Sequence, residues 1–161
     1  MKAFKKSIVA AAAMFGVLQA APAFACIAGP YVSMPTVTLS GTVTAAQNTY
    51  LYANSSIYSP NGVYRLIFQT DGNLVLYKNG TQVIWDTNTE NCIPTPYAAY
   101  TTRFQPDGNL VVYYTTTPGL QEIAVWDTNT QGHPNARLVV QDDGNVVIYD
   151  SNNRVLWAVR R

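Results

Sequence analysis

One short motif, written three times at a fixed interval, limits what this chain can fold into more than any other feature. The motif has the form Q-x-D-G-N-x-V-x-Y, and each copy begins 36 residues after the previous one. A repeat of this length indicates a repeated supersecondary unit, so we expect an array of similar units. The motif positions are Gln69, Asp71, Asn73, Val75 and Tyr77, then Gln105, Asp107, Asn109, Val111 and Tyr113, and finally Gln141, Asp143, Asn145, Val147 and Tyr149.

Each copy has the pattern of a β-hairpin, because Asp-Gly stands between two runs of alternating apolar residues. A two-residue loop (71–72) and a three-residue loop (70–72) both fit the first copy. The second copy favours the longer loop, since its residues 106–108 are Pro-Asp-Gly. Pro suits the first central position of a type I turn, and Gly suits the left-handed residue that closes a three-residue loop with a bulge. This loop predicts that Gln105 lies opposite Asn109.

The predicted hairpins have two different faces, because side chains alternate along a strand. One face is apolar and is expected to form the core. The other carries the Gln, Asn, Val and Tyr of the motif, with the Asp at the turn. The predicted core residues are Leu66, Phe68, Leu74 and Leu76, then Thr102, Phe104, Leu110 and Val112, and finally Leu138, Val140, Val146 and Ile148.

A tryptophan follows each motif, at Trp85, Trp126 and Trp157. Three equivalent tryptophans on strands rich in aliphatic residues are expected to pack near a shared axis. An exposed role, in which the tryptophan rings stack on a ligand, is the alternative.

No helix is visible after residue 25, the expected strands are short and turns are frequent. The sequence therefore predicts an all-β protein with threefold internal pseudosymmetry.

Residues 1–25 have the features of a signal peptide. Three lysines lie in the first six residues, Ile8–Leu18 is an apolar run, and Ala23-Phe24-Ala25 is a small-x-small cleavage site. The run is too short for a membrane-spanning helix. We expect cleavage before Cys26 and a secreted, periplasmic or cell-surface protein. A lipoprotein attached through Cys26 is the alternative, which Phe24 disfavours.

The expected organisation is a signal peptide (1–25), an N-terminal tail with one or two edge strands (26–49) and one domain with three repeats (50–161). Removing the signal peptide leaves seven basic and nine acidic residues, a formal net charge of −2. The basic residues are scattered, which argues against nucleic-acid binding and membrane insertion.

The two cysteines, Cys26 and Cys92, would meet an oxidising environment after export, so a disulfide between them is predicted. Two unrelated thiols are the alternative. No residues have the spacing of metal ligands, so no metal or other cofactor is expected.

The sequence contains few residues that are arranged for catalysis. The single histidine, His133, lies in a Gly-His-Pro loop and is interpreted as a solvated loop residue. Each motif offers one Asp, whereas hydrolysis of sugars needs two carboxylates.

The motif residues are suited to binding a polyol. Their amides, carboxylate and phenol supply hydrogen-bond donors and acceptors, and Val offers an apolar patch. The fifteen motif residues are therefore the candidate carbohydrate-binding residues. A purely structural role for Asp-Gly-Asn is the alternative.

The three motifs, together with the tryptophan strands and the Thr-Asn-Thr after Trp85 and Trp126, resemble the bulb-type mannose-binding lectin domain over roughly residues 50–161. The resemblance implies a type II β-prism of three antiparallel, four-stranded sheets around a pseudo-threefold axis. It implies mannose held by Asp and Asn at O2, Gln near O3, Tyr at O4 and Val under the ring. Family members often dimerise by exchanging a C-terminal strand, so a homodimer is possible.

We therefore expect an exported, calcium-independent lectin that binds mannose-containing glycans at three sites and is not an enzyme. A lectin-like bacteriocin or an adhesin would use the same sites. A protein–protein interaction domain without sugar binding is the alternative from another class.

Overall fold

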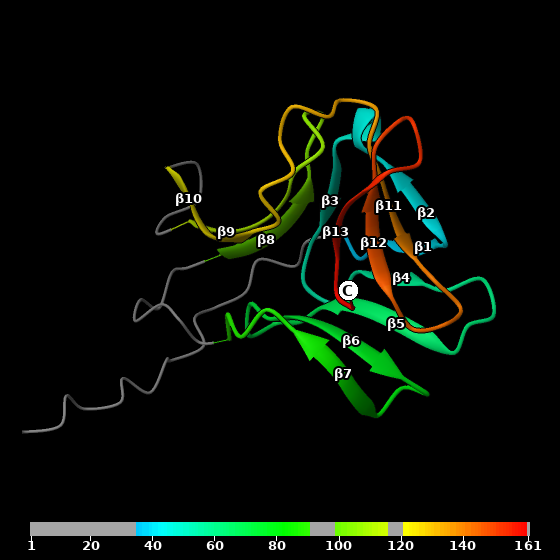
Figure 1. Ribbon diagram of the computed structural model, residues 1–161. Coiled ribbons are helices and arrows are strands. Elements are labelled where there is room, and N and C mark those ends of the chain that lie inside the picture. The colour runs from blue at the N-terminus through cyan, green and yellow to red at the C-terminus, as the bar shows by residue number, and fades with distance from the viewer. Residues whose placement is uncertain (1–34, 91–98, 116–120, 161) are drawn as a thin grey trace, which may run out of the picture.

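The computed structural model describes residues 35–90, 99–115 and 121–160. In this part of the chain there are thirteen short strands, one 3₁₀ turn and no α-helix. The strands form three sheets around one core (Figure 1). The predicted all-β class and its three sheets are confirmed.

The first sheet has the strand order β1-β4-β5-β6-β7, and the first motif lies at its β5–β6 hairpin. All neighbours in this sheet are antiparallel except β1 and β4, which are parallel. The bounds are β1 Thr38–Ser40, β4 Ser56–Tyr58, β5 Tyr64–Phe68, β6 Leu74–Lys78 and β7 Gln82–Asp86.

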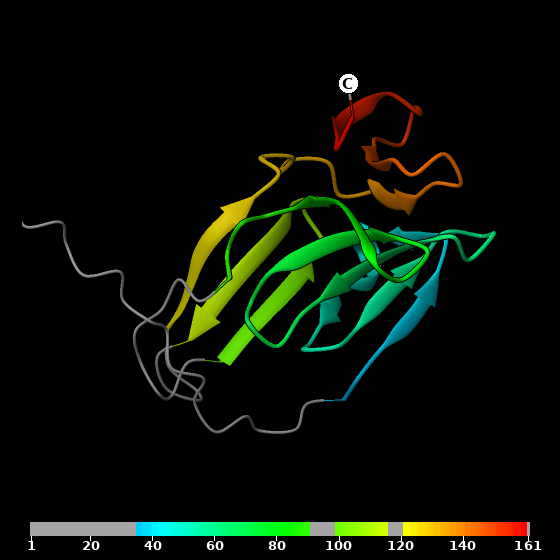
Figure 2. The same cartoon turned by 90° about the horizontal axis from the view of Figure 1, so that it is seen from below.

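The second and third sheets are four-stranded and antiparallel, with the orders β10-β9-β8-β3 and β13-β12-β11-β2. The second and third motifs lie at the β8–β9 and β11–β12 hairpins, so each motif belongs to a different sheet (Figures 1 and 2). The bounds are β3 Thr49–Leu51, β8 Ala99–Phe104, β9 Leu110–Thr115 and β10 Glu122–Asp127, and then β2 Thr42–Thr44, β11 Arg137–Val140, β12 Val146–Tyr149 and β13 Val155–Ala158.

The N-terminal segment 38–51 differs from the expectation of one or two edge strands. It supplies β1, β2 and β3, and each is the outermost strand of a different sheet. Gly41, at a φ of 71°, lets the chain cross between sheets, since its N–H donates to the Tyr58 carbonyl and its carbonyl accepts from the Val140 N–H. The fold thus uses residues on both sides of the expected boundary at residue 50.

The first sheet has one strand more than the family resemblance implied. The chain leaves it after β1, passes through β2, the 3₁₀ turn Ala45–Gln47 and β3, and returns as β4. This long excursion allows β4 to run parallel to β1, which a tight hairpin cannot do.

The motif hairpins have the predicted three-residue loop. The Gln69 N–H donates to the Asn73 carbonyl at 2.8 Å, the second and third copies have the same bond, and Phe68 pairs with Leu74. Gly72 closes the loop at a φ of 88°, in the left-handed region that favours glycine. A side chain there would also collide with the ring of Tyr100, so the turn packs tightly against the next repeat.

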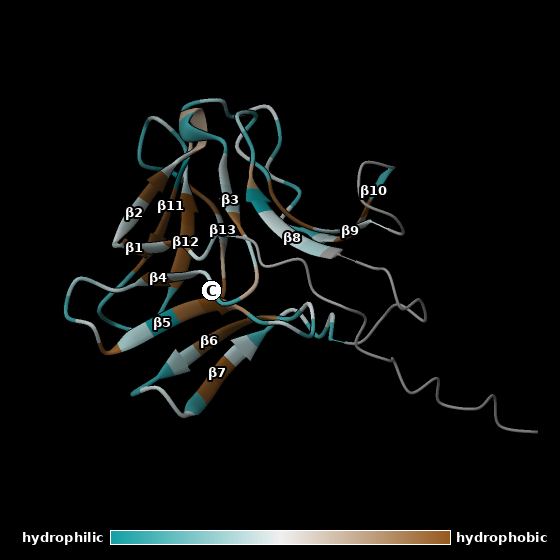
Figure 3. Ribbon diagram, turned by 180° about the vertical axis from the view of Figure 1, so that it is seen from behind, coloured by the Kyte–Doolittle hydropathy of each residue, from teal (hydrophilic) through white to brown (hydrophobic). Residues whose placement is uncertain are grey.

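The twelve predicted core residues are all buried, with at most 1% exposure, and the eleven apolar ones belong to one hydrophobic cluster. Hydrophobic residues run along β6, β11 and β12 in particular (Figure 3). The three tryptophans meet as predicted, with ring centroids 5.6–5.9 Å apart in edge-to-face contacts. Trp85, Trp126 and Trp157 thus form a triangle to which each sheet contributes one ring.

The signal peptide 1–25 and the proposed Cys26–Cys92 disulfide lie outside the described residues. Within the described ranges no helix is long and apolar enough to cross a membrane. The same ranges contain no group of His, Cys, Asp or Glu side chains that could hold a metal ion.

Candidate functional site

The outer faces of the three hairpins carry the motif residues, and we call these faces the first, second and third sites. In the first site, Asp71 closes the turn because its Oδ1 accepts from the Asn73 N–H at 3.0 Å. Asp107 and Asp143 make the equivalent bonds at 3.0 and 2.9 Å. One oxygen of each carboxylate is therefore used by the turn itself.

The Gln and Tyr of each motif are joined across the hairpin. Gln69 Nε2 donates to the Tyr77 hydroxyl at 3.1 Å, and the equivalent bonds of the second and third sites are 2.7 and 2.9 Å long. Since the tyrosine oxygen accepts this bond, its own proton is available to a ligand. The structure thus brings the predicted Gln and Tyr together in all three sites.

The motif asparagine has a structural role as well. Asn73 is buried, and its Oδ1 accepts from Thr87 Oγ1 at 2.8 Å and from the Thr89 N–H at 3.3 Å. Thr89 Oγ1 also donates to the Gly72 carbonyl at 2.8 Å. The Thr-Asn-Thr segment after the tryptophan strand therefore holds the motif turn in place.

The second site repeats this arrangement. Asn109 Oδ1 accepts from Thr128 Oγ1 at 2.9 Å and from the Thr130 N–H at 3.2 Å. The repeated Thr-Asn-Thr was visible in the sequence, but its link to the motif asparagine was not predicted, because it depends on the pairing of β7 and β10 with the hairpins.

Four polar groups of the first site have no partner among the described residues. They are the second carboxylate oxygen of Asp71, Nδ2 of Asn73, Oε1 of Gln69 and the hydroxyl proton of Tyr77. Two of them accept and two donate. A set of this kind matches the hydroxyl groups of a sugar, each of which both donates and accepts.

The motif valines, predicted from the sequence as the apolar patch of each site, are nearly covered by their neighbours. Val75, Val111 and Val147 are each only 2% exposed. Each stands between the Asn and the Tyr of its motif, two residues from either, and so on the same face of the hairpin. The valines form the closed floor of the sites.

The third site departs from the other two. The backbone of Arg160 takes the place of Thr-Asn-Thr: its N–H donates to Asn145 Oδ1 at 2.9 Å, and its carbonyl accepts from Asn145 Nδ2 at 3.1 Å. One of the four groups, the amide donor of the asparagine, is therefore already in use. This difference is visible in the sequence, since Ala-Val-Arg follows Trp157 where the other copies have Asp-Thr-Asn after the tryptophan.

The comparisons with known proteins agree with this geometry. A scan of protein-family models and a search of curated proteins give no match, whereas solved structures do. A monomeric monocot mannose-binding lectin from Gastrodia elata is 34% identical with a TM-score of 0.60, covering 74% of this chain and 96% of that one. The mannose-specific lectin of bluebell, Scilla campanulata, is 35% identical with a TM-score of 0.54, covering 75% and 98%.

The mannose-specific agglutinin of snowdrop, Galanthus nivalis, solved with methyl-α-D-mannoside, is 32% identical with a TM-score of 0.56 and covers 74% of this chain and 95% of its own. The chain belongs to the bulb-type mannose-binding lectin family. The expected β-prism II fold is thereby confirmed. The matched bulb-type lectins are not enzymes, in agreement with the prediction of a non-catalytic protein.

The second site of this bulb-type lectin has a half-buried cation, Arg103, which was not predicted from the sequence. Arg103 Nη1 donates to the Tyr50 hydroxyl at 2.6 Å, and Nη2 pairs with Glu122 at 3.0 Å. Burial lowers the pKa of Arg103, but contacts with Tyr113 and Tyr50 and the charge of Glu122 outweigh it, so this pKa is raised above its ordinary value.

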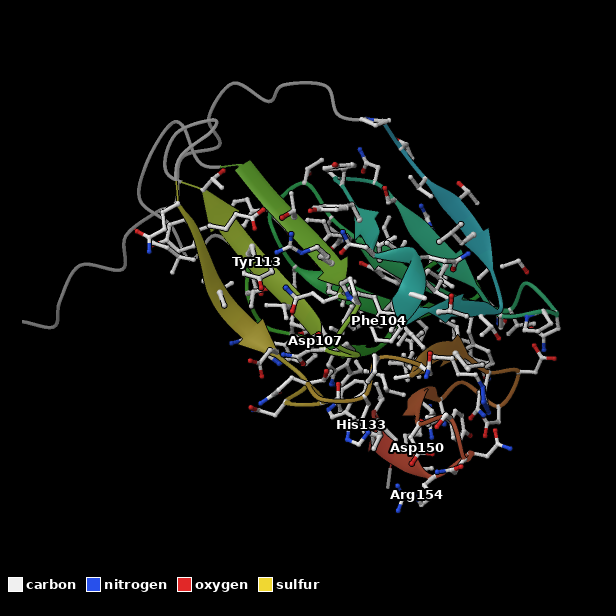
Figure 4. All side chains as sticks on the ribbon, turned by 90° about the horizontal axis from the view of Figure 1, so that it is seen from above. Phe104, Asp107, Tyr113, His133, Asp150 and Arg154 are labelled. Carbon is white, nitrogen blue, oxygen red and sulfur yellow. The ribbon has the colours of Figure 1, made fainter. Side chains whose placement is uncertain are left out.

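Two further residues, His133 and Asp142, connect the repeats. The His133 N–H donates to the Asp107 carbonyl at 2.8 Å, so this half-buried residue supports the second motif turn (Figure 4). Asp142 accepts from the Asn61 N–H at 2.9 Å and ties the third motif turn to the β4–β5 turn. Both contacts hold a motif turn against a neighbouring repeat.

Proposed function

We propose that this protein is an exported, calcium-independent lectin that binds mannose-containing glycans at the fifteen motif residues of its three sites. The observation that carries the proposal is the set of two acceptors and two donors left free in the first site. Its relatives include lectins solved with methyl-α-D-mannoside and with a monomannoside. Export rests on the signal-peptide features of residues 1–25.

The three sites are not equal in this proposal. The second site repeats the polar groups of the first, whereas the third has Asn145 Nδ2 engaged by Arg160. Losing one hydrogen bond weakens binding by a free energy of about 1 kcal/mol, roughly a factor of five. We therefore expect two stronger sites and one weaker site.

Each site is small and contacts a single sugar ring, so its dissociation constant for monovalent mannose is expected to be on the order of millimolar. Strong attachment to a glycan surface then comes from several sites acting together, through effective concentration.

Titration with methyl mannoside, alongside binding to a mannan-coated surface, tests the proposal. Asp71→Asn is the informative variant, because the amide Oδ1 can still accept from the Asn73 N–H while the free acceptor becomes a donor. We expect it to lose one of the stronger sites, leave the others unchanged and reduce surface binding by much more than a third.

The matched control is Thr70→Ser, which changes an exposed residue of the same turn and should bind like the wild type. The triple variant Asp71→Asn, Asp107→Asn, Asp143→Asn should fold and bind no mannoside. Undiminished binding by the triple variant would place the sugar elsewhere. No binding by the folded wild type would favour the protein–protein interaction domain.

A further inference from the structure

The second site differs from the other two at one position in the middle of its outer face. The residue opposite the motif valine is Ile67 in the first site and Val139 in the third, but Arg103 in the second. The floor of the second site is therefore one aliphatic side chain and the stem of an arginine, with a guanidinium at its end.

The guanidinium is held in a fixed position by aromatic and polar neighbours. It lies 4.9 Å from the centroid of the Tyr113 ring and 5.1 Å from that of Tyr50. Nη1 and Nη2 bind the Tyr50 hydroxyl and Glu122, and the buried Nε has no hydrogen-bond partner in the described part of the chain. Arginine has five N–H donors, so several are left for a ligand.

Two tyrosine hydroxyls that neighbour Arg103 accept hydrogen bonds and have their own protons left over. The Tyr50 hydroxyl accepts from Arg103, and the Tyr113 hydroxyl accepts from Gln105. Each hydroxyl thus keeps its proton for a further acceptor. Together with Arg103 they form a group of donors beside the motif, and the only acidic side chain that pairs with this arginine in the described chain is Glu122.

The arginines of the other sites are placed differently. Arg65 and Arg137 lie opposite Tyr77 and Tyr149, two residue pairs farther from the turn than the position that Arg103 has in the second site. Arg137 stacks on Tyr149 at 4.7 Å and donates to Asn153, whereas Arg65 donates to Ser56. The third site has a cation at its motif turn, since Arg160 Nη1 donates to the Asp143 carbonyl at 3.4 Å. Among the three sites, only the second has an arginine opposite the motif valine, in the middle of the outer face.

We propose that the second site takes a saccharide that carries an acidic group, a carboxylate or a phosphate, held by Arg103 with the hydroxyls of Tyr50 and Tyr113. The proposal rests on the proposed function, since the sugar ring occupies the motif residues. The acidic group takes the place of Glu122, whose side chain is 36% exposed and can turn to solvent. An exchange of this kind is feasible because such partly exposed ion pairs are weak.

The test isolates the second site in the double variant Asp71→Asn, Asp143→Asn. Its ligands are methyl mannoside, mannose carrying a phosphate on O6, mannuronic acid and inorganic phosphate alone. We expect the better of the two acidic sugars to bind about tenfold more tightly than methyl mannoside, as charge-assisted hydrogen bonds imply. The phosphate and carboxylate arms identify which acid the site prefers.

Three variants in this background test the role of Arg103. Arg103→Gln should bring the affinity ratio of acidic to neutral sugar close to one, and Arg103→Lys should keep part of the preference. Glu122→Gln should increase the preference, because the competing carboxylate is gone. The matched control is Arg137→Gln, the same substitution at the third site, which should leave the ratio unchanged.

The possible failures are distinguishable. If methyl mannoside binds but neither acidic sugar binds more tightly, the inference is wrong and the proposed function stands. If the folded double variant binds no sugar, the proposed function fails at this site. Equal binding of inorganic phosphate and the sugar phosphate would show an anion site without a saccharide and would also overturn the inference, as would an equal effect of Arg137→Gln.

Discussion

A buried threonine can stabilise or weaken this fold, depending on whether its hydroxyl has a hydrogen-bond partner. Two threonines of the second repeat, Thr102 in β8 and Thr128 just after β10, show both cases. Thr102 is fully buried at a position where the other hairpins have Leu66 and Leu138, and its Oγ1 has no partner among the described residues. Thr128 is also buried, but its Oγ1 donates to Asn109 Oδ1 and accepts from the Leu110 N–H at 3.1 Å. The Thr102 hydroxyl therefore lowers the stability of the fold, whereas the Thr128 hydroxyl supports the second site.

The substitution Thr→Val therefore has opposite expected signs at these two positions. Thr102→Val removes an unsatisfied hydroxyl and should raise the free energy of unfolding by about 1 kcal/mol. Thr128→Val leaves the Leu110 N–H and Asn109 unsatisfied and should lower it by about 2 kcal/mol. Denaturant unfolding of both variants and the wild type measures the two changes in the free energy of unfolding. Destabilisation by Thr102→Val would mean that its hydroxyl has a hydrogen-bond partner after all.

Among the elements, the turn between β12 and β13 depends on a single carboxylate. Asp150 is buried, its Oδ1 accepts from the Asn152 and Arg154 N–H groups at 2.8 and 2.9 Å, and its Oδ2 accepts from Arg154 Nε at 2.7 Å. Hydrogen bonds from the Arg154 backbone and side chain and from Asn152 hold the pKa of Asp150 below its ordinary value, although burial opposes them.

This turn should make stability depend on pH in the acid range. Because the pKa is lower in the folded state, the carboxylate contributes fully above its ordinary pKa of about 4, and the contribution is lost as the pH falls through the folded value. We expect the melting temperature of the wild type to exceed that of Asp150→Asn at pH 7, and the difference to shrink only in acid. A constant difference down to about pH 2 would contradict this assignment.

The hairpins could be predicted in detail because their geometry is set locally. Pro106 and the following Asp-Gly determine the loop length, and the loop length determines which side chains face the core. The strands β1, β2 and β3 were foreseen only as an edge strand or two, since three residues show almost no alternation and their partners lie far along the chain. The contacts of Arg103 with Tyr50 and Glu122 were not predictable, because they join three strands that only the tertiary fold places side by side.

At the scale of the whole molecule, the tryptophan triangle holds the three sheets to one another. Each ring contacts both of the others, so removing one ring affects all three sheets. The triangle is half-buried rather than fully enclosed, which reduces its contribution below that of a central core residue.

Trp85→Ala should lower the free energy of unfolding by about 3 kcal/mol, the lower end of the range for truncating a large aromatic residue. Val83→Ala is the matched control on the same strand, since Val83 is 51% exposed, and it should change stability by less than about 0.5 kcal/mol. Calorimetry should show one transition for each variant. A variant in which one sheet melts before the others would show that the triangle does not couple them.

The N-terminal segment also sets the order in which the chain can fold during synthesis. Thr44 of β2 pairs with Arg137, 93 residues later, and Leu51 of β3 pairs with Thr102. A growing chain therefore carries two unpaired strands until its second and third repeats have been made, and such distant pairings form slowly. Strands that wait in this way are open to pairing with other chains. The sheets consequently cannot be completed one after another as the repeats are made. Strand β2, near the N-terminus, can pair only after the third repeat has been synthesised.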